Sequence, residues 1–168
     1  DHIFSDLPNS LFPQTQQVCV VTHDLDACIR GFADRLGIGP WWVNCYEAPL
    51  LVNARLRGEP VECSFLLGLA WTGALNWEVI QPLAGPSIYK EYLEAQGEGI
   101  HHVGFFLQNL RMDWELCHRE LEQRGFERLF EAQWSGVSFC YYDTLDPAHT
   151  TFEIIYRPEG WTRPEPHY

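Results

Sequence analysis

The two halves of this 168-residue sequence predict the same order of elements: a strand, a helix and about three further strands. The repeated order predicts an α+β fold of two similar modules. Three observations support it: short apolar runs bounded by Gly or Pro, one amphipathic helix pattern in each half, and short connections between strands. Such connections allow antiparallel pairing, because parallel crossovers need a dozen or more residues. Two half-sheets with one apolar face each can bury those faces together.

The first module is expected over residues 15–83, after an N-terminal extension of residues 1–14. A β-branched run over 15–21 predicts its first strand. Asp24 is a suitable helix N-cap, apolar residues recur at three- and four-residue spacing from Leu25 to Leu36, and Gly37 provides the stop. The strands that should follow cover residues 41–46, 50–57, 61–71 and 76–81.

A linker helix is expected within residues 84–99, capped by Ser87, and the second module over residues 100–157. That module should contain a strand, a helix from about Arg111 to Arg124, and three more strands. The tail, residues 158–168, is rich in proline and is expected to lie on the surface.

Composition limits the function classes. Hydrophobic residues make up 46% and charged residues 20%, which favours a packed core over disorder. The sequence has no uncharged apolar run of about 18 residues and no signal-peptide pattern at its start. A net charge of −12 argues against nucleic acid or an anionic membrane as partner. The six cysteines form no C-x-x-C pair, which favours a reducing, cytoplasmic setting.

Four polar residues stand inside otherwise apolar strands, at matching places in the two halves. Gln17 and His102 lie in the first strand of each half, and Glu78 and Glu153 in the last strand of each. Two buried carboxylates would repel one another and lose solvation. A divalent cation between them would remove both penalties, and the imidazole and amide would complete its ligand set.

Several segments resemble the vicinal-oxygen-chelate superfamily, in particular its glyoxalase-like and methylmalonyl-CoA epimerase-like members. The match runs over roughly residues 15–157 and rests on GIHHVGF (99–105), NWEVIQPL (76–83), TFEII (151–155) and VTHDLD (21–26) with the later LGIGP (36–40). The resemblance implies paired βαβββ modules that form a half-open mixed β-barrel around a metal site. It places Glu78, His102 and Glu153 on ligand positions, and Gln17 where a His is commoner.

One divalent ion is expected, with Zn, Ni, Co, Mn, Mg and Fe all open. Glu78 and Glu153 are also the predicted catalytic residues, since a displaced ligand carboxylate can move a proton. Glu47 and Glu62 are alternative bases. His101 should point to the opposite sheet face by strand alternation, as a structural or supporting residue. His23 is read as a turn residue that can also substitute as a ligand or proton carrier.

The substrate is expected to be a small carbonyl or aromatic compound. Trp41, Trp42 and Trp71 are predicted to line its site, although core packing explains most tryptophans. Arg55 or its neighbour Arg57 is a candidate for holding a substrate carboxylate, against the alternative of a solvated strand face.

Three functions remain open at this point. The favoured one is a metal-dependent isomerase, epimerase or glyoxalase-type lyase that moves a proton beside a metal-polarised carbonyl or enediolate. The others are an iron-dependent ring-cleaving dioxygenase, which would use two His and one carboxylate, and a metal-free protein that sequesters an aromatic compound. Module pairing within or between chains leaves a homodimer open as well.

Overall fold

The structure, a computed structural model, describes residues 11–110 and 112–168. Most of the predicted N-terminal extension and Arg111, the expected start of the second-module helix, lie outside the described residues. The strands are β1 (Gln17–Val21), β2 (Trp42–Tyr46), β3 (Leu51–Leu56), β4 (Glu59–Pro60), β5 (Phe65–Thr72), β6 (Leu75–Pro82), β7 (Gly99–Phe106), β8 (Arg128–Trp134), β9 (Val137–Tyr142) and β10 (Thr151–Tyr156). The helices are α1 (Leu25–Leu36), α2 (Ile88–Gln96), α3 (Trp114–Gln123) and the short α4 (Leu145–Ala148), with 3-10 turns η1 (Ala48–Leu50) and η2 (Leu107–Asn109).

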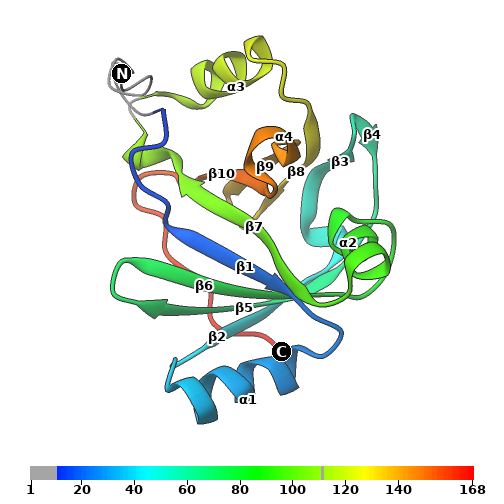
Figure 1. The fold of residues 1–168 in the computed structure, drawn as a ribbon, viewed down its shortest axis with the longest axis vertical. Coiled ribbons are helices and arrows are strands. Elements are labelled where there is room, and N and C mark those ends of the chain that lie inside the picture. The colour runs from blue at the N-terminus through cyan, green and yellow to red at the C-terminus, as the bar shows by residue number, and fades with distance from the viewer. Residues whose placement is uncertain (1–10, 111) are drawn as a thin grey trace, which may run out of the picture.

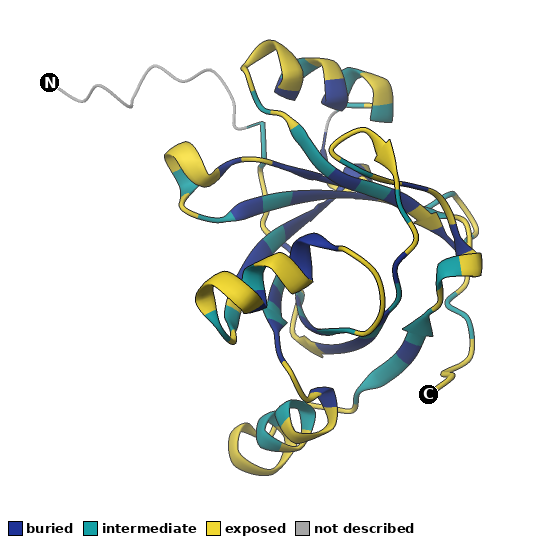
Figure 2. Cartoon of the chain, turned by 90° about the vertical axis from the view of Figure 1, so that its right-hand side faces the viewer, coloured by how far each residue is buried: buried dark blue, intermediate teal, exposed yellow. Residues whose placement is uncertain are grey.

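Within the described residues, ten strands form one mixed sheet in the order β2-β5-β6-β1-β7-β10-β9-β8-β3-β4. The sheet curls on itself into a half-open barrel, with α1 at one end and α3 at the other (Figures 1 and 2). The α+β class and the half-open barrel predicted from the sequence are therefore confirmed. The central pairs β1–β6 and β7–β10 are parallel, and β1–β7, which joins the two halves, is antiparallel.

The hairpin of β3 and β4 departs from the predicted arrangement. Its residues were expected to pair within the first half, yet β3 pairs with β8 of the second half. The first half thus keeps β1, β2, β5 and β6 side by side, while β3 and β4 extend the far edge of the sheet. Local pattern predicts that residues 51–56 are extended, but it carries no information on which edge they join.

Two apolar clusters hold the fold together. The larger fills the inside of the curl and includes Phe65, Tyr89, Phe130 and Tyr141, all of which are buried. The smaller lies between α3 and the outer face of the second half, where Leu121 packs with strand residues. The buried colouring in Figure 2 follows the strands, while the outward faces of the helices are exposed.

The tail after β10 does more than lie on the surface. It runs beside β2, where the Trp42 indole N–H donates to the carbonyl of Pro164 (2.9 Å) and the Cys45 N–H donates to that of His167 (3.0 Å). Asn44 also donates from its side chain to the carbonyl of Glu165 (3.2 Å). The tail therefore docks against the edge strand of the first half.

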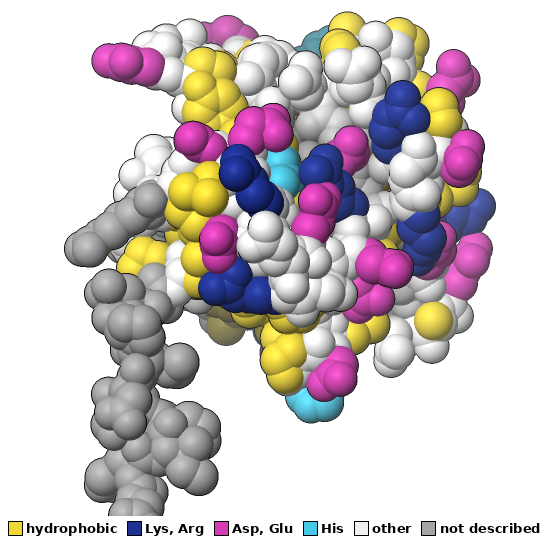
Figure 3. Space-filling model, turned by 90° about the horizontal axis from the view of Figure 1, so that it is seen from above, with side chains coloured by type: hydrophobic (Ala, Val, Ile, Leu, Met, Phe, Trp, Pro, Cys, Tyr) yellow, Lys and Arg dark blue, Asp and Glu magenta, His cyan; other side chains and the backbone are white. Residues whose placement is uncertain are grey.

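None of the described helices is long and apolar enough to cross a bilayer. All six cysteines are free thiols. Seen from above, on the face that carries α3, basic and acidic side chains are interspersed (Figure 3). This face offers no basic stripe of the kind that follows a phosphate backbone.

Candidate metal centre

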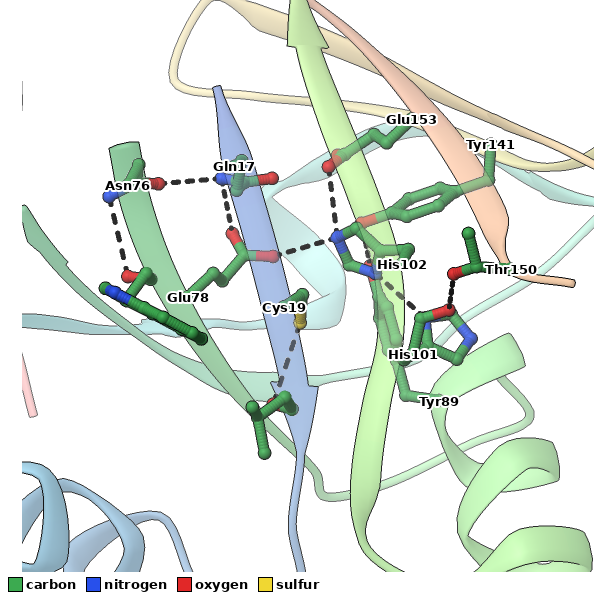
Figure 4. Close-up of polar contacts among 12 residues, drawn as sticks. Gln17, Cys19, Asn76, Glu78, Tyr89, His101, His102, Tyr141, Thr150 and Glu153 are labelled. Carbon is green, nitrogen blue, oxygen red and sulfur yellow. Dashed lines mark hydrogen bonds and ion pairs between the residues drawn. The ribbon is translucent and has the colours of Figure 1, made fainter. Parts of the chain in front are cut away.

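The four predicted ligands come from the four central strands of the sheet. Gln17 lies on β1, Glu78 on β6, His102 on β7 and Glu153 on β10, and these strands are neighbours in the order β6-β1-β7-β10. Cross-strand register brings them together, because Cys19 is paired with both Glu78 and His102, and Gly104 with both Gln17 and Glu153. All four predicted ligands are buried, and their side chains converge inside the curl (Figure 4).

His102 lies at the centre of this group. Its Nε2 is 3.1 Å from Glu78 Oε1 and 3.2 Å from Glu153 Oε2. The contact with Glu78 has hydrogen-bond geometry, whereas Glu153 Oε2 has no hydrogen-bond partner. A single ring nitrogen thus faces two carboxyl groups, and its one N–H cannot form a well-aligned hydrogen bond with both of them.

The side-chain amide of Gln17 is held by two acceptors. Its Nε2 donates to Asn76 Oδ1 (2.9 Å) and to Glu78 Oε2 (3.2 Å). Asn76 is fully buried and is itself fixed by donation to the carbonyl of Ala70 (3.1 Å). These bonds leave Gln17 Oε1 buried and without a partner. Because the amide donates through Nε2, its oxygen is left free. This oxygen is the only atom of the amide group that can bind a cation.

Gly104 makes room for that amide. A Cβ on Gly104 would lie 2.6 Å from Gln17 Oε1 and 2.9 Å from Gln17 Cβ, both too close for any side chain. The glycine of the HHVG segment is thus required by the space that Gln17 occupies on the neighbouring strand.

His101 corrects one prediction. Strand alternation predicted that it faces away from the site, but its Nδ1 lies 2.8 Å from Nδ1 of His102. The reason is a register shift: Cys19 pairs with His102 and the next residue, Val20, pairs with Ile100, so His101 is an extra residue. Such a bulge breaks strict alternation. His101 can accept a hydrogen bond from His102 Nδ1, which leaves His102 Nε2 directed at the two carboxylates.

The close contacts and burial of His101, His102 and Glu153 shift the pKa values of all three residues. Burial lowers the pKa of His102, but its contacts with Glu153 and Glu78 outweigh burial and raise the pKa to about 9. Burial and the charge of His102 lower the pKa of His101 to about 2, so His101 is neutral. Burial raises the pKa of Glu153 despite its contact with His102. Without a cation, the raised pKa of His102 favours a protonated imidazole between Glu78 and Glu153.

A divalent ion fits this donor set. Among the described residues, only four buried polar side-chain atoms lack a hydrogen-bond partner, and Gln17 Oε1 and Glu153 Oε2 are two of them. Unsatisfied buried oxygens are costly, and a bound cation would satisfy both. Cys19 was not predicted: its Sγ lies with ligand atoms of Glu78 and His102 within 4.8 Å of one another. It follows Gln17 by two residues on β1, so strand parity could have revealed it.

A cavity opens beside this centre, with about 490 Å³ of space between protein atoms, part of it continuous with solvent. Gln17, Glu78 and Glu153 lie in its wall. The remaining wall is largely aromatic and apolar, with two arginines, and consists of Tyr46, Phe65, Leu67, Leu69, Tyr89, Val137, Phe139, Tyr141, Ile155, Arg157, Trp161 and Arg163. The hydroxyls of Tyr89 and Tyr141 lie 2.7 Å apart in one hydrogen bond.

The predicted substrate-contacting residues are not in that wall. Trp41 packs against Phe32 beneath α1, and its indole N–H donates to the carbonyl of Ile38 (2.8 Å). Trp42 and Trp71 flank the guanidinium of Arg163, 4.8 and 5.0 Å from their ring centroids. These two tryptophans therefore contact Arg163, which lines the cavity, and do not line it themselves.

The remaining candidates lie on the surface. Arg55 donates to the carbonyl of Gly58 (2.9 Å), and Arg57 is paired with Glu91 at 2.9 Å, both in exposed settings. Glu47 and Glu62, the alternative bases, are also exposed and absent from the cavity wall. A substrate contact by Trp42 or Trp71 stays a prediction.

Residues 16–141 match the model of the Glyoxalase/Bleomycin resistance protein/Dioxygenase superfamily. The chain therefore belongs to this superfamily, whose members are largely metal-dependent enzymes. Among proteins with curated functions, none matches this chain.

Solved structures of similar fold include methylmalonyl-CoA epimerase from Mycobacterium tuberculosis, with TM-score 0.62, 18% identity and coverage of 90% of this chain and 93% of that one. A hypothetical protein, BH1468 from Bacillus halodurans, gives TM-score 0.64 at 13% identity, with coverage of 89% and 98%. A variant of Streptomyces coelicolor methylmalonyl-CoA epimerase in complex with 2-nitronate-propionyl-CoA gives 0.57 at 18% identity, with coverage of 92% and 100%. At these identities the likeness concerns the fold.

Proposed function

We propose that this protein is a metal-dependent isomerase, epimerase or glyoxalase-type lyase that moves a proton on the carbon next to a carbonyl group. The observation that carries the proposal is the pair of buried oxygens without a hydrogen-bond partner, Gln17 Oε1 and Glu153 Oε2, whose residues lie in the wall of one cavity beside Glu78 and His102. The fold likeness to epimerases supports it, because a base can invert a carbon centre by removing and returning a proton.

Gln17, Glu78, His102 and Glu153 would hold the ion, with Cys19 beside them. When bound, a divalent ion polarises a carbonyl oxygen and stabilises the charge that develops when the neighbouring C–H is deprotonated. His101 keeps Nε2 of His102 directed into the site, and Asn76 keeps the oxygen of Gln17 free.

Glu153 is the better placed of the two predicted catalytic carboxylates. Glu78 is engaged through both oxygens, Oε1 with His102 and Oε2 with the Gln17 amide. Glu153 has an oxygen without a hydrogen bond, and burial raises the pKa of its carboxyl, which makes it a stronger base. Glu153, as a ligand displaced from the ion, would therefore take the proton from substrate and return it, while Glu78 stays fixed.

Two measurements test the proposal. Elemental analysis of the purified protein should find about one divalent ion per chain, and Glu78→Ala, His102→Ala or Glu153→Ala should each abolish stoichiometric binding in a folded protein. In D₂O, NMR should show exchange of the proton next to the carbonyl in a panel of 2-oxo and 2-hydroxy acids, without dioxygen. Glu153→Gln should stop the exchange, and Glu47→Gln, a change at an exposed acid outside the cavity, should not.

Other outcomes would assign the protein to another class. Iron as the sole active metal, together with strict dependence on dioxygen, would identify a ring-cleaving dioxygenase. A protein that takes up no metal and binds an aromatic compound tightly without product would identify a sequestering protein.

A further inference from the structure

The end of the chain brings two arginines into the cavity. Arg157 directly follows β10 and Arg163 lies in the docked tail, and both are half-buried in the wall that also contains Glu153. Neither was predicted as a site residue: Arg157 was placed at the end of the second module, and Arg163 in a tail that was expected to lie on the surface.

Both guanidiniums are held by aromatic rings rather than by acids. Arg157 Cζ lies 4.2 Å from the ring centroid of Phe106 and 5.2 Å from that of Trp161. Arg163 Cζ lies 5.5 Å from the same Trp161 ring, in addition to its contacts with Trp42 and Trp71. Stacking fixes each planar group while leaving its N–H donors free at the edge.

No ion pair joins either of these half-buried arginines to an acid of the described chain. Arg157 Nε is a third of the four buried polar atoms that lack a partner. Burial, together with the neighbouring Arg163, lowers the pKa of Arg157 to about 10, although Tyr46, Glu153 and Glu78 act in the opposite direction. Two like charges therefore lie in one partly desolvated cavity, and its two acids, Glu78 and Glu153, form no ion pair with either of them, so a bound anion would stabilise both arginines.

We infer that Arg157 and Arg163 form an anion subsite, and that the substrate is a small carbonyl compound carrying a carboxylate on the side away from the metal centre. This inference rests on the proposed function for the position of the carbonyl, but the anion subsite itself is independent of the metal. Guanidinium N–H groups match carboxylate oxygens in geometry, and such charged hydrogen bonds are the strong ones.

The spacing along β10 places the anion at a distance from the metal centre. Glu153 and Ile155 alternate along β10, Arg157 directly follows the strand at the same two-residue spacing, and all three line the cavity. Four residues of extended chain span about 13 Å. The two side chains can lean toward each other, so a substrate that reaches both needs several bonds between its carbonyl and its carboxylate. A compound with the carboxylate next to the carbonyl alone would not fill both ends.

The test compares 2-oxoglutarate with 2-oxopentanoate, which is the same 2-oxo acid without the distal carboxylate. Calorimetric titration of the metal-loaded protein should show about 10- to 100-fold tighter binding of 2-oxoglutarate, the range expected for hydrogen bonds to a charged group. Arg157→Gln and Arg163→Gln should each reduce that preference at least about fivefold. Arg157→Lys should restore part of it, and Arg55→Gln, at an exposed arginine outside the cavity, should leave it unchanged. Circular dichroism of every variant establishes that it is folded.

The same titrations on chelator-treated protein separate this inference from the proposed function. Equal binding of the two compounds, no binding of 2-oxoglutarate at millimolar concentration, or a preference that survives Arg157→Gln would each overturn the anion subsite. A preference that depends on Arg157 in a protein that takes up no metal would support the subsite and refute the metal-dependent function.

Discussion

Substitution of Gly104 by alanine tests the geometry of the Gln17 ligand most directly. The added methyl carbon would lie 2.6 Å from Gln17 Oε1, whereas real contacts of this kind are essentially never under 3.0 Å and ordinary ones begin at 3.4 Å, so the amide must move by 0.4 to 0.8 Å. Metal sites tolerate deviations of only about 0.2 Å in ligand distance. Gly104→Ala should therefore weaken metal binding by about 10- to 100-fold, as loss of a ligand's positioning usually does.

The same displacement should destabilise the fold. Moving the amide disturbs its hydrogen bonds to Asn76 Oδ1 and Glu78 Oε2, each contributing about 0.5–1.5 kcal/mol, and adds overpacking within a buried sheet. We expect Gly104→Ala to lower the free energy of unfolding by about 1–3 kcal/mol. Urea denaturation of the chelator-treated protein measures this change, and titration with Zn²⁺ measures the change in affinity.

A double-mutant cycle identifies the cause. Gln17→Ala removes the side chain that the new methyl group meets, so Gly104→Ala should cost much less stability in the Gln17→Ala background than alone. Gly31→Ala is the matched control, because a Cβ at that position on α1 meets nothing within 4 Å; it should leave metal binding unchanged and the protein no less stable. Additive effects of the Gly104 and Gln17 substitutions, or unchanged Zn²⁺ affinity in Gly104→Ala, would refute the assignment of Gln17 Oε1 as a ligand.

Three further predictions concern the surroundings of the centre. Asn76→Ala should weaken Zn²⁺ binding by about 10-fold and lower the melting temperature, because the Gln17 amide loses its fixed orientation; Zn²⁺ titration and thermal melts check both, and unchanged affinity would contradict the role. His101→Phe should keep the packing and lower metal affinity by about 10- to 100-fold, because His102 Nδ1 loses its acceptor; metal affinity equal to that of the unsubstituted protein would exclude the assigned tautomer. Metal at 100 times its Kd should stabilise the protein by about 2.7 kcal/mol over the chelated form, and equal melting temperatures of the two forms would argue against a site in the folded state.

The main features of the fold and the group of residues at the candidate site could be predicted from the sequence, because both follow from local rules. Polar residues are rare inside apolar strands, so Gln17, Glu78, His102 and Glu153 stand out and can be compared between the halves. Period-two alternation then predicts one common face for each strand. The structure brings these four residues together at the centre of the sheet.

What could not be predicted depends on pairing between distant segments. The bulge that turns His101 toward His102 exists only in the register of β7 against β1. The edge that β3 joins is set by β8, more than 70 residues further along the chain. A proline-rich tail has no hydrophobic period, so nothing in its own sequence reveals that it docks beside β2.

Period-two alternation along β10 could also have revealed Arg157. Arg157 continues the parity of Glu153 and Ile155, so a strand extended by one residue would have placed a cation on the face that carries the candidate metal ligands. The rule that singled out two buried carboxylates applies equally to a buried guanidinium: each requires an opposite charge within reach. When the rule is applied to the carboxylates and to the guanidinium, it predicts a cavity with two ends. A cation would stabilise the acidic end, and an anion would stabilise the basic end. A substrate whose carbonyl faces the first and whose carboxylate faces the second would satisfy both ends, which is why the distal carboxylate, rather than the aromatic wall, is the feature we expect to determine specificity.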